Sequence, residues 1–301
     1  MSSAVLDKLS NDAWARAVFG YRPSEAAAWA AMAVFAALSA CNAFITARTR
    51  APGTRYLYWI PFSGAMEAVG YILRVLTVQR RDRHLLIGAA VLLVLPPIPL
   101  AVINYVAVGK LMRATGVHFG RLQPQHVARL FLASDVICLV VQGQGATMLT
   151  GTGFGSAAAG KAVILAGLVL QLGFFSAFVV LALALQRRAA ARLARVPALR
   201  RVFGVLYATV TLLYTRNVSR AVEFAQMTDR AAYTTTHEWL FYVFNAIAIA
   251  AVVALYTVWH FAALLPSDDA LSAAMAGEAP PTPQEGADGY LMPTKQADEN
   301  A

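Results

Sequence analysis

The chain has 301 residues, of which 58% are hydrophobic and only 14% are charged. A soluble domain carries roughly 25% charged residues, so this composition indicates a membrane protein rather than a soluble one. The formal net charge of +9 does not indicate nucleic-acid binding, because the basic residues are spread over short loops between apolar segments, while acidic residues gather near the C-terminus.

The expected elements begin with a short exoplasmic arm at residues 1–21, which contains an amphipathic turn or two. Seven apolar segments follow, each near the length of about 20 residues that a membrane-spanning helix needs. They are Ala26–Thr46, Tyr56–Leu76, Leu85–Val108, Val127–Leu149, Lys161–Leu185, Val202–Glu223 and His237–Leu265. They are too long and too weakly alternating for barrel strands, and backbone inside lipid must satisfy its own hydrogen bonds. The sequence therefore predicts an all-α, polytopic seven-transmembrane-helix bundle within a domain at 22–265.

The loops also predict an orientation. Thirteen Lys and Arg residues fall on the side of the first, third and fifth connections and the C-terminal tail, against seven on the opposite side. Basic residues collect on the cytoplasmic side of membrane proteins, which places the N-terminus outside and the C-terminus in the cytoplasm. Residues 266–301 are rich in Pro, Ala and acidic residues, and we expect them to form a disordered cytoplasmic tail.

The third segment contains the sequence LPPIPL at 95–100. Prolines remove backbone donors, so this helix is expected to kink or unwind here. Such breaks occur in membranes only where protein or a cavity covers the freed carbonyls. The break is either part of a cavity wall or a structural kink alone.

Four of the segments carry a polar stripe with helical spacing. The stripes comprise Glu67, Tyr71 and Arg74; Asp135, Cys138 and Gln142; Arg216, Arg220 and Glu223; and Glu238, Tyr242 and Asn245. Residues three, four or seven apart share one face of a helix, and ionisable groups within a membrane usually face the bundle interior. Counting residues along each helix places the stripes in the exoplasmic half, with Asp135 nearer the middle. Two interpretations stay open: a structural ion-pair network that holds the helices together, and a cavity that binds a ligand.

If the charges meet, three acidic and three basic residues can form one connected network: Glu67, Arg74, Arg216, Arg220, Glu223 and Glu238. Asp135 is then the odd acid. We consider it a candidate for a proton-linked step or for binding the ammonium group of a lipid.

No cofactor or metal is expected. The five histidines, including His237, are divided between the two membrane faces, so three zinc ligands do not come together. The seventh segment has no lysine for a retinal Schiff base, and no nucleophile–base pair that would indicate an enzyme is evident.

Six stretches, in this order, resemble the fungal RTA-like family of seven-helix proteins, also called lipid-translocating exporters. They are YRPS at 21–24, EAVGYILR at 67–74, SDVICLVVQGQG at 134–145, GLVLQLGFF at 167–175, RNVSRAVEFAQ at 216–226 and HEWLFYVFNA at 237–246. The family usually has Asp at the position of Asn245 and Gly at that of Met227. Asn245 cannot ionise, so a charge-dependent role at this position does not carry over.

The resemblance implies a plasma-membrane protein linked to the export of sphingoid long-chain bases and to resistance against lipophilic toxic compounds, with one branch linked to porphyrin uptake. Its partners would be membrane lipids and a lipophilic amine or lipid substrate, and its oligomeric state is not indicated. The candidate cavity-lining residues are Glu67, Tyr71, Arg74, Asp135, Gln142, Gln171, Arg216, Arg220, Glu223, His237, Glu238, Tyr242 and Asn245. A transporter is the first interpretation and a seven-helix receptor or lipid sensor the second.

Overall fold

A computed structural model describes residues 10–49, 55–120, 122–149, 156–190, 197–226 and 233–260. Helices dominate these residues, and no strand is found among them. A short helix, α2 (Asn11–Phe19), leads to the long helices α3 (Glu25–Thr49) and α4 (Trp59–Arg80), the latter preceded by the short turn η1 (Arg55–Tyr58). The predicted tail at 266–301 lies outside the described residues.

The rest of the bundle continues in chain order. It comprises α5 (Arg83–Val94), α6 (Pro97–Thr115), α7 (Pro124–Leu149), α8 (Ala157–Arg188), α10 (Pro197–Gln226), α11 (Tyr233–Thr236), α12 (Glu238–Phe241), η2 (Tyr242–Ile247) and α13 (Ala248–Val258). The last three form one continuous helix, in which η2 is a π-helical segment.

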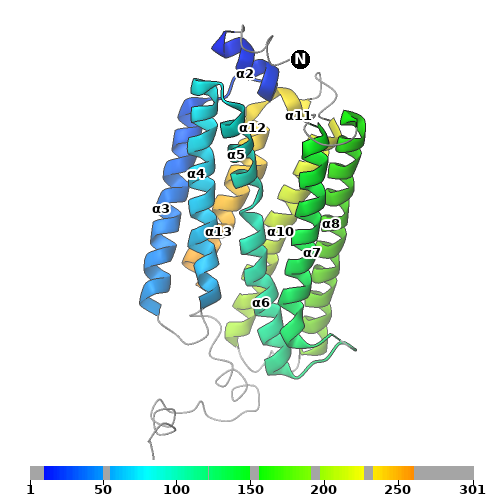
Figure 1. The fold of residues 1–301 in the computed structure, drawn as a ribbon. Coiled ribbons are helices and arrows are strands. Elements are labelled where there is room, and N and C mark those ends of the chain that lie inside the picture. The colour runs from blue at the N-terminus through cyan, green and yellow to red at the C-terminus, as the bar shows by residue number, and fades with distance from the viewer. Residues whose placement is uncertain are drawn as a thin grey trace, which may run out of the picture.

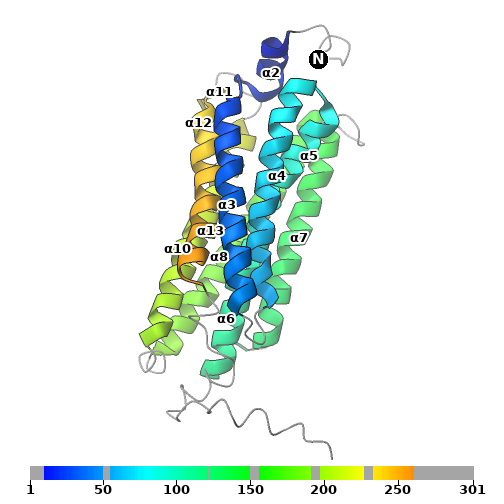
Figure 2. The ribbon, with the colours of Figure 1, turned by 90° about the vertical axis from the view of Figure 1, so that its left-hand side faces the viewer.

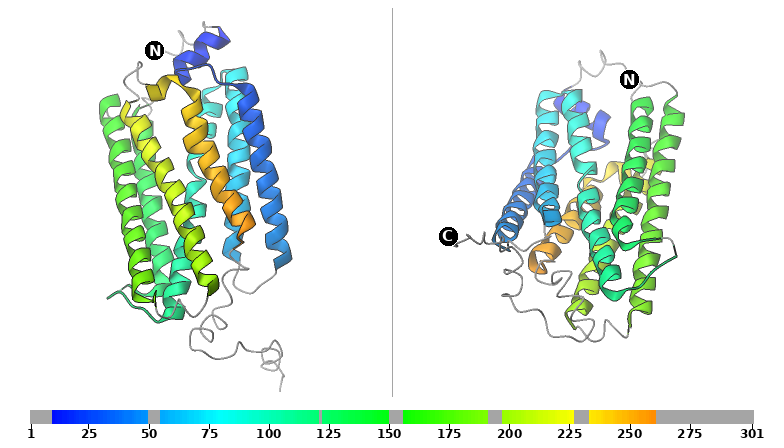
Figure 3. Two further views of the ribbon diagram at one scale, coloured as in Figure 1. Left: turned by 180° about the vertical axis from the view of Figure 1, so that it is seen from behind. Right: turned by 60° about the horizontal axis from the view of Figure 1, so that its bottom comes forward.

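The helices stand side by side along one axis, with α2 lying across one end (Figure 1). Neighbours in sequence are neighbours in space from α3 through α10, and α13 then packs between α10 and α3 (Figures 2 and 3). The ring of helices is thereby closed. Helix α6 contacts α4, α7, α8, α10 and α13, and it therefore occupies the interior of the bundle.

Five helices of the described residues are long and apolar enough to cross a membrane, counting α5 and α6 as one. They are Glu25–Thr49, His84–Thr115, Pro124–Leu149, Ala157–Arg188 and Glu238–Val258. The two remaining predicted spans correspond to α4 and α10, which have 22 and 30 residues. These two helices carry most of the charged residues of the polar stripes, which lowers their hydropathy. The all-α polytopic fold is confirmed, while the count of seven spans and the orientation stay predictions.

Large apolar side chains remain on the outer surface of the bundle. Val180 is 64% exposed, Val169 63% and Phe44 58%. A membrane protein presents such side chains to lipid, so their exposure does not oppose folding in a bilayer. The interior combines an apolar core with buried polar groups such as Glu67, Asp135 and Arg216.

Helices α7 and α8 approach one another closely through small residues. A Cβ atom added at Gly145 would lie 2.7 Å from Ile164 and 2.8 Å from the carbonyl oxygen of Gly160. A Cβ at Gly160 would in turn lie 2.7 Å from the carbonyl oxygen of Gly145. Such contacts between small residues are a common way for helices to associate in membranes.

The predicted break in the third span is present. Helix α5 ends at Val94 and α6 begins at Pro97, so Leu95 and Pro96 form the junction. The N–H of Ile98 bonds to the carbonyl of Leu95, three residues earlier instead of four. The prolines thus cause a local departure from the α-helix, as their missing donors require.

Candidate functional site

Asp135 of α7 apart, the charged side chains of the polar stripes come from α4, α10 and α12. These helices adjoin one another or the arm at the end of the bundle that α2 covers (Figure 1). The inward faces of these helices hold Glu67, Arg74 and Arg216, which are at most 6% exposed. Each of these groups needs a partner, because an isolated charge is costly inside a membrane protein.

Arg74 lies at the end of α4 that is nearest to the arm. Its Nη2 atom donates to the Tyr21 hydroxyl at 2.7 Å and lies 3.5 Å from Oε1 of Glu238. Its guanidinium carbon is 4.9 Å from the centroid of the Phe19 ring and 4.4 Å from that of Phe241. Arginine stacks well on aromatic faces, so rings and a carboxylate together hold this cation in place.

The arm is joined to the bundle by these same residues. The backbone N–H of Ser24 donates to both carboxylate oxygens of Glu238, at 3.0 and 2.9 Å. Trp14 of α2 is 2% exposed. Burial raises the pKa of Tyr21 above its usual value, and the charge of Arg74 opposes this shift. The described part of the arm, residues 10–21, is therefore a folded cover over one end of the helices.

Arg216 satisfies a carbonyl that the break between α5 and α6 leaves open. In a continuous helix, the carbonyl of Leu93 would accept from the N–H of residue 97, but Pro97 has none. The Arg216 Nη2 atom donates to this carbonyl at 2.8 Å, and its Nε atom donates to Oδ1 of Asn245 at 3.0 Å. One side chain thus connects α10 to the broken helix and to the π-helical segment η2.

Glu67 is fully buried in α4, and its carboxylate oxygens have no hydrogen-bond partner among the described residues. The charges of Arg216 and Arg220 act on it. Tyr71, one turn along, stacks between Phe35 and Tyr242 at centroid distances of 5.8 and 6.1 Å. Glu67 therefore has neither a direct ion pair nor a hydrogen bond among the described residues, and the nearby charges only partly offset its burial.

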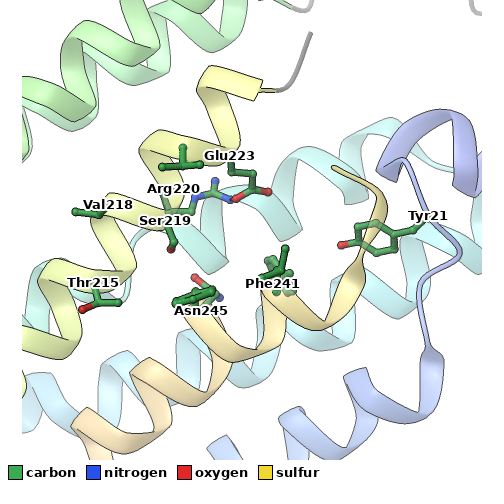
Figure 4. Close-up of a pocket in the computed structure, with 11 residues that line it drawn as sticks. Tyr21, Thr215, Val218, Ser219, Arg220, Glu223, Phe241 and Asn245 are labelled. Atoms are coloured by element: carbon green, nitrogen blue, oxygen red, sulfur yellow. The ribbon is translucent and has the colours of Figure 1, made fainter. Parts of the chain in front are cut away.

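Arg220 and Glu223 form the second ion pair, with 2.8 Å between Nη1 and Oε2. They border a pocket of about 270 Å³ between α10 and the α12–η2 helix. Its lining comprises Tyr21, Thr215, Val218, Ser219, Arg220, Val222, Glu223, Leu240, Phe241, Phe244 and Asn245. In Figure 4 the Arg220–Glu223 pair lies on one side, Asn245 and Phe241 on the other, and Tyr21 of the arm at one end.

Asp135, Gln142 and Gln171 lie outside the pocket between α10 and α12–η2. Asp135 accepts a hydrogen bond from the Tyr105 hydroxyl at 2.9 Å, and Gln142 of α7 donates to Gln171 of α8 at 3.0 Å. Asp135 and Gln171 border a separate cavity of about 10 Å³ near the start of α6. This space is too small for a lipid head group with its attached chain, so it does not favour the expectation that Asp135 binds a lipid ammonium.

The structure differs from the expected single network of six charges. The described residues form two separate ion pairs, Arg74–Glu238 and Arg220–Glu223, with Arg216 bonded to neutral partners. The physical reason is that the proline break and Asn245 supply oxygen atoms that compete for the Arg216 guanidinium.

His237 also differs from expectation. Its ring stacks on Tyr233 and lies 2.8 Å from the Thr236 hydroxyl, within the connection before α12. It does not border the pocket between α10 and α12–η2. Within the described residues, no group of three His, Cys, Asp or Glu side chains is placed to hold a metal ion.

Sequence reasoning missed the role of the arm. Tyr21 borders the pocket and bonds to Arg74, yet it precedes the apolar segments and shares no helical face with the stripes. The available signal was the stretch YRPS at 21–24, which contributed to the family resemblance without suggesting a contact. Asn217 borders the small cavity with Asp135 and Gln171. It was also missed, because it lies beside the stripe of α10 rather than on it.

Fold and site together define a polytopic α-helical membrane protein with buried charges and a pocket near one end. The chain belongs to the RTA1-like protein family, whose model matches residues 60–268. The resemblance inferred from the short stretches is thereby confirmed. The matched region includes all the charged stripes but begins after the arm.

Two proteins of Saccharomyces cerevisiae are similar to this chain. Protoporphyrin uptake protein 1 is 29% identical over 216 residues, which cover 67% of this chain and 68% of that protein. Protein RTM1 is 26% identical over 212 residues, covering 66% of this chain and 65% of that protein, just under two thirds. No solved structure shows a significant match.

Proposed function

We propose that the protein moves lipophilic molecules through the membrane and that they bind in the pocket between α10 and α12–η2. The observation that carries this proposal is the composition of the pocket. Apolar side chains such as Val218, Leu240 and Phe244 line most of it, and the Arg220–Glu223 pair supplies charge at its border. This arrangement suits a molecule with one polar head and an apolar body.

The pocket also has an edge on the outer surface of the bundle. Val218 and Val222 both line it, and they are 38% and 40% exposed. In a bilayer this surface faces lipid, so a lipophilic molecule could reach the pocket sideways from the membrane. Entry from lipid fits a transporter of membrane-soluble compounds better than one of water-soluble solutes.

Sphingoid long-chain bases or related lipids are the proposed substrates. Their ammonium group would compete with Arg220 for Glu223, while the chain lies along the apolar wall. The relative named Protoporphyrin uptake protein 1 suggests a second head-group chemistry. A carboxylate would pair with Arg220, because a guanidinium binds carboxylates through two parallel hydrogen bonds.

In this proposal the protein performs no covalent chemistry, acts in the plasma membrane, and contributes to resistance against toxic lipophilic compounds. The alternative is a receptor or lipid sensor without transport. The arm favours this alternative, because Tyr21 belongs to the arm, borders the pocket and accepts a hydrogen bond from Arg74 of α4. Ligand binding could then be signalled through the position of the arm.

The test is reconstitution of the full chain in lipid vesicles with a fluorescent long-chain base. Transfer of the label between leaflets, faster than in protein-free vesicles, is the expected result. Saturable binding without transfer would support the sensor instead. Absence of both binding and transfer for long-chain bases and for porphyrins would contradict the proposed substrate classes.

A further inference from the structure

The small cavity around Asp135 is distinct from the pocket between α10 and α12–η2. It measures about 10 Å³ and lies among α6, α7, α8 and α10, next to the junction of α5 and α6. A void of this size holds roughly one particle the size of a water molecule. Tyr105 of α6 borders it, and so do three further polar residues from three other helices: Asp135, Gln171 and Asn217.

Asp135 lacks a positive partner. It is 3% exposed, and the hydroxyl of Tyr105 is the one hydrogen-bond donor that the described residues offer its carboxylate. No Arg, Lys or His in the described part of the chain acts on it electrostatically. Glu67 provides the contrast, because the charges of Arg216 and Arg220 act on that carboxylate. An ionised Asp135 therefore finds no compensating positive charge among the described residues.

The other two polar groups offer oxygen atoms to such a charge. Asn217 is 6% exposed, borders the cavity, and makes no side-chain hydrogen bond within the described residues. The Gln171 amide oxygen accepts one hydrogen bond from Gln142 and retains a second lone pair. Both amide groups can therefore offer an oxygen atom to a ligand in the cavity.

We propose that this cavity binds one small inorganic cation of the size of sodium, held by oxygen atoms of Asp135, Asn217 and Gln171. Carboxylate and amide oxygens are the ligands that hard cations prefer. A proton on Asp135 would remove the charge, but it would leave Asn217 without a partner and the space unused. A bound cation would neutralise the Asp135 carboxylate, take the Asn217 amide oxygen as a ligand and fill the cavity.

Such a cation would join α7, α8 and α10, which supply the three ligands, beside the break in the third span. The site does not depend on the proposed transport function, because none of its ligands borders the pocket between α10 and α12–η2. Its most direct consequence is stability: a ligand that binds only the folded state raises the unfolding temperature with its concentration.

The experiment is thermal unfolding of the purified full chain in detergent, with sodium chloride replacing N-methylglucamine chloride at constant ionic strength and pH. Lithium and potassium chloride serve as comparisons of cation size. The variants are Asp135→Asn, which removes the charge with little change of shape, and Asn217→Ala, which removes one ligand. Glu67→Gln is the matched control, because it neutralises another buried acid outside the cavity.

We expect a saturable, sodium-specific rise of the unfolding temperature for the wild type and for Glu67→Gln, and none for Asp135→Asn. Asn217→Ala should shift the sodium midpoint upward by about tenfold, equivalent to about 1.4 kcal/mol. An equal rise in Asp135→Asn, or no sodium-specific rise in the wild type, would overturn the proposal.

Two further outcomes also decide the question. A wild type that responds to pH but not to sodium, with the response lost in Asp135→Asn, would identify a proton site and contradict the cation. If Asp135→Asn fails to fold, an unchanged sodium midpoint in Asn217→Ala would contradict it equally. Neither result bears on leaflet transfer, so this inference and the transport proposal can fail separately.

Discussion

Replacing Arg216 with methionine tests whether the buried charges stabilise the broken helix. The substitution keeps an extended apolar side chain but removes both hydrogen bonds of the guanidinium, to the carbonyl of Leu93 and to Asn245. It also removes a positive charge that acts on Glu67, a fully buried acid. The Leu93 carbonyl, the Asn245 amide and the Glu67 carboxyl group thus each lose a favourable interaction.

The expected loss of unfolding free energy can be bounded from measured values for hydrogen bonds and for buried charges. Interhelical side-chain hydrogen bonds in a membrane protein average about 0.6 kcal/mol, whereas bonds to charged groups in soluble proteins contribute roughly 1.5–3 kcal/mol each. Leaving a buried charge uncompensated is strongly destabilising, by about 3–5 kcal/mol where it has been measured. For Arg216→Met we expect a loss of about 2–4 kcal/mol in unfolding free energy, arising from the two hydrogen bonds and from the positive charge beside Glu67.

The assay is reversible unfolding of the purified protein by sodium dodecyl sulfate in mixed micelles. Arg201→Met is the matched control, because Arg201 lies on the same helix but is exposed. If the Glu67 charge matters, the effect of Arg216→Met should shrink by at least about 1 kcal/mol in a Glu67→Gln background. An Arg216→Met effect within about 0.5 kcal/mol of the wild type would refute the reasoning, as would an undiminished effect in that background.

Further predictions concern the arm, the helix packing and the tail. Tyr21→Phe should weaken arm docking by about 1 kcal/mol through loss of the bond to Arg74, measured as faster proteolysis within the arm. Because the pKa of Tyr21 is raised in the folded state, docking should be complete below the ordinary tyrosine value of about 10 and weaken as pH rises through the raised value, which proteolysis at graded pH would show. Gly145→Ala should destabilise the protein by about 1–3 kcal/mol in the same micelle assay, whereas Gly143→Ala, with open space around its Cβ, should have little effect. Deletion of 270–301 should leave the amount of folded protein and leaflet transfer unchanged, and loss of transfer at normal expression would instead indicate a regulatory tail.

The sequence was sufficient to predict the membrane class, the helical segments and the position of the helix break. These features depend on local properties: the length of an apolar run, and prolines that lack an N–H donor. The stripe containing Glu67 and Arg74 was also predictable, because its spacing places both residues on one helix face, and both are buried.

The partners of these residues were not predictable in the same way. Arg216 could have paired with an acid, but the carbonyl of Leu93 is a backbone group whose availability depends on how α5, α6 and α10 meet. Likewise, the contact of Tyr21 with Arg74 joins residues 53 positions apart through a chain reversal that no pattern specifies. Hydropathy also understated α4 and α10, since Glu67, Arg74 and Arg216 are charged residues that these helices bury in the interior.

The most direct test of the proposed pocket is leaflet transfer of a fluorescent long-chain base by Val218→Trp in reconstituted vesicles. The added ring would occupy the pocket between α10 and α12–η2, which Val218 borders. Val180→Trp is the control, because it places the same ring on the exposed surface of α8, outside that pocket. If the long-chain base binds in this pocket, Val218→Trp should abolish leaflet transfer at normal levels of folded protein, whereas Val180→Trp should retain it. Unimpaired transfer by Val218→Trp would contradict the assignment.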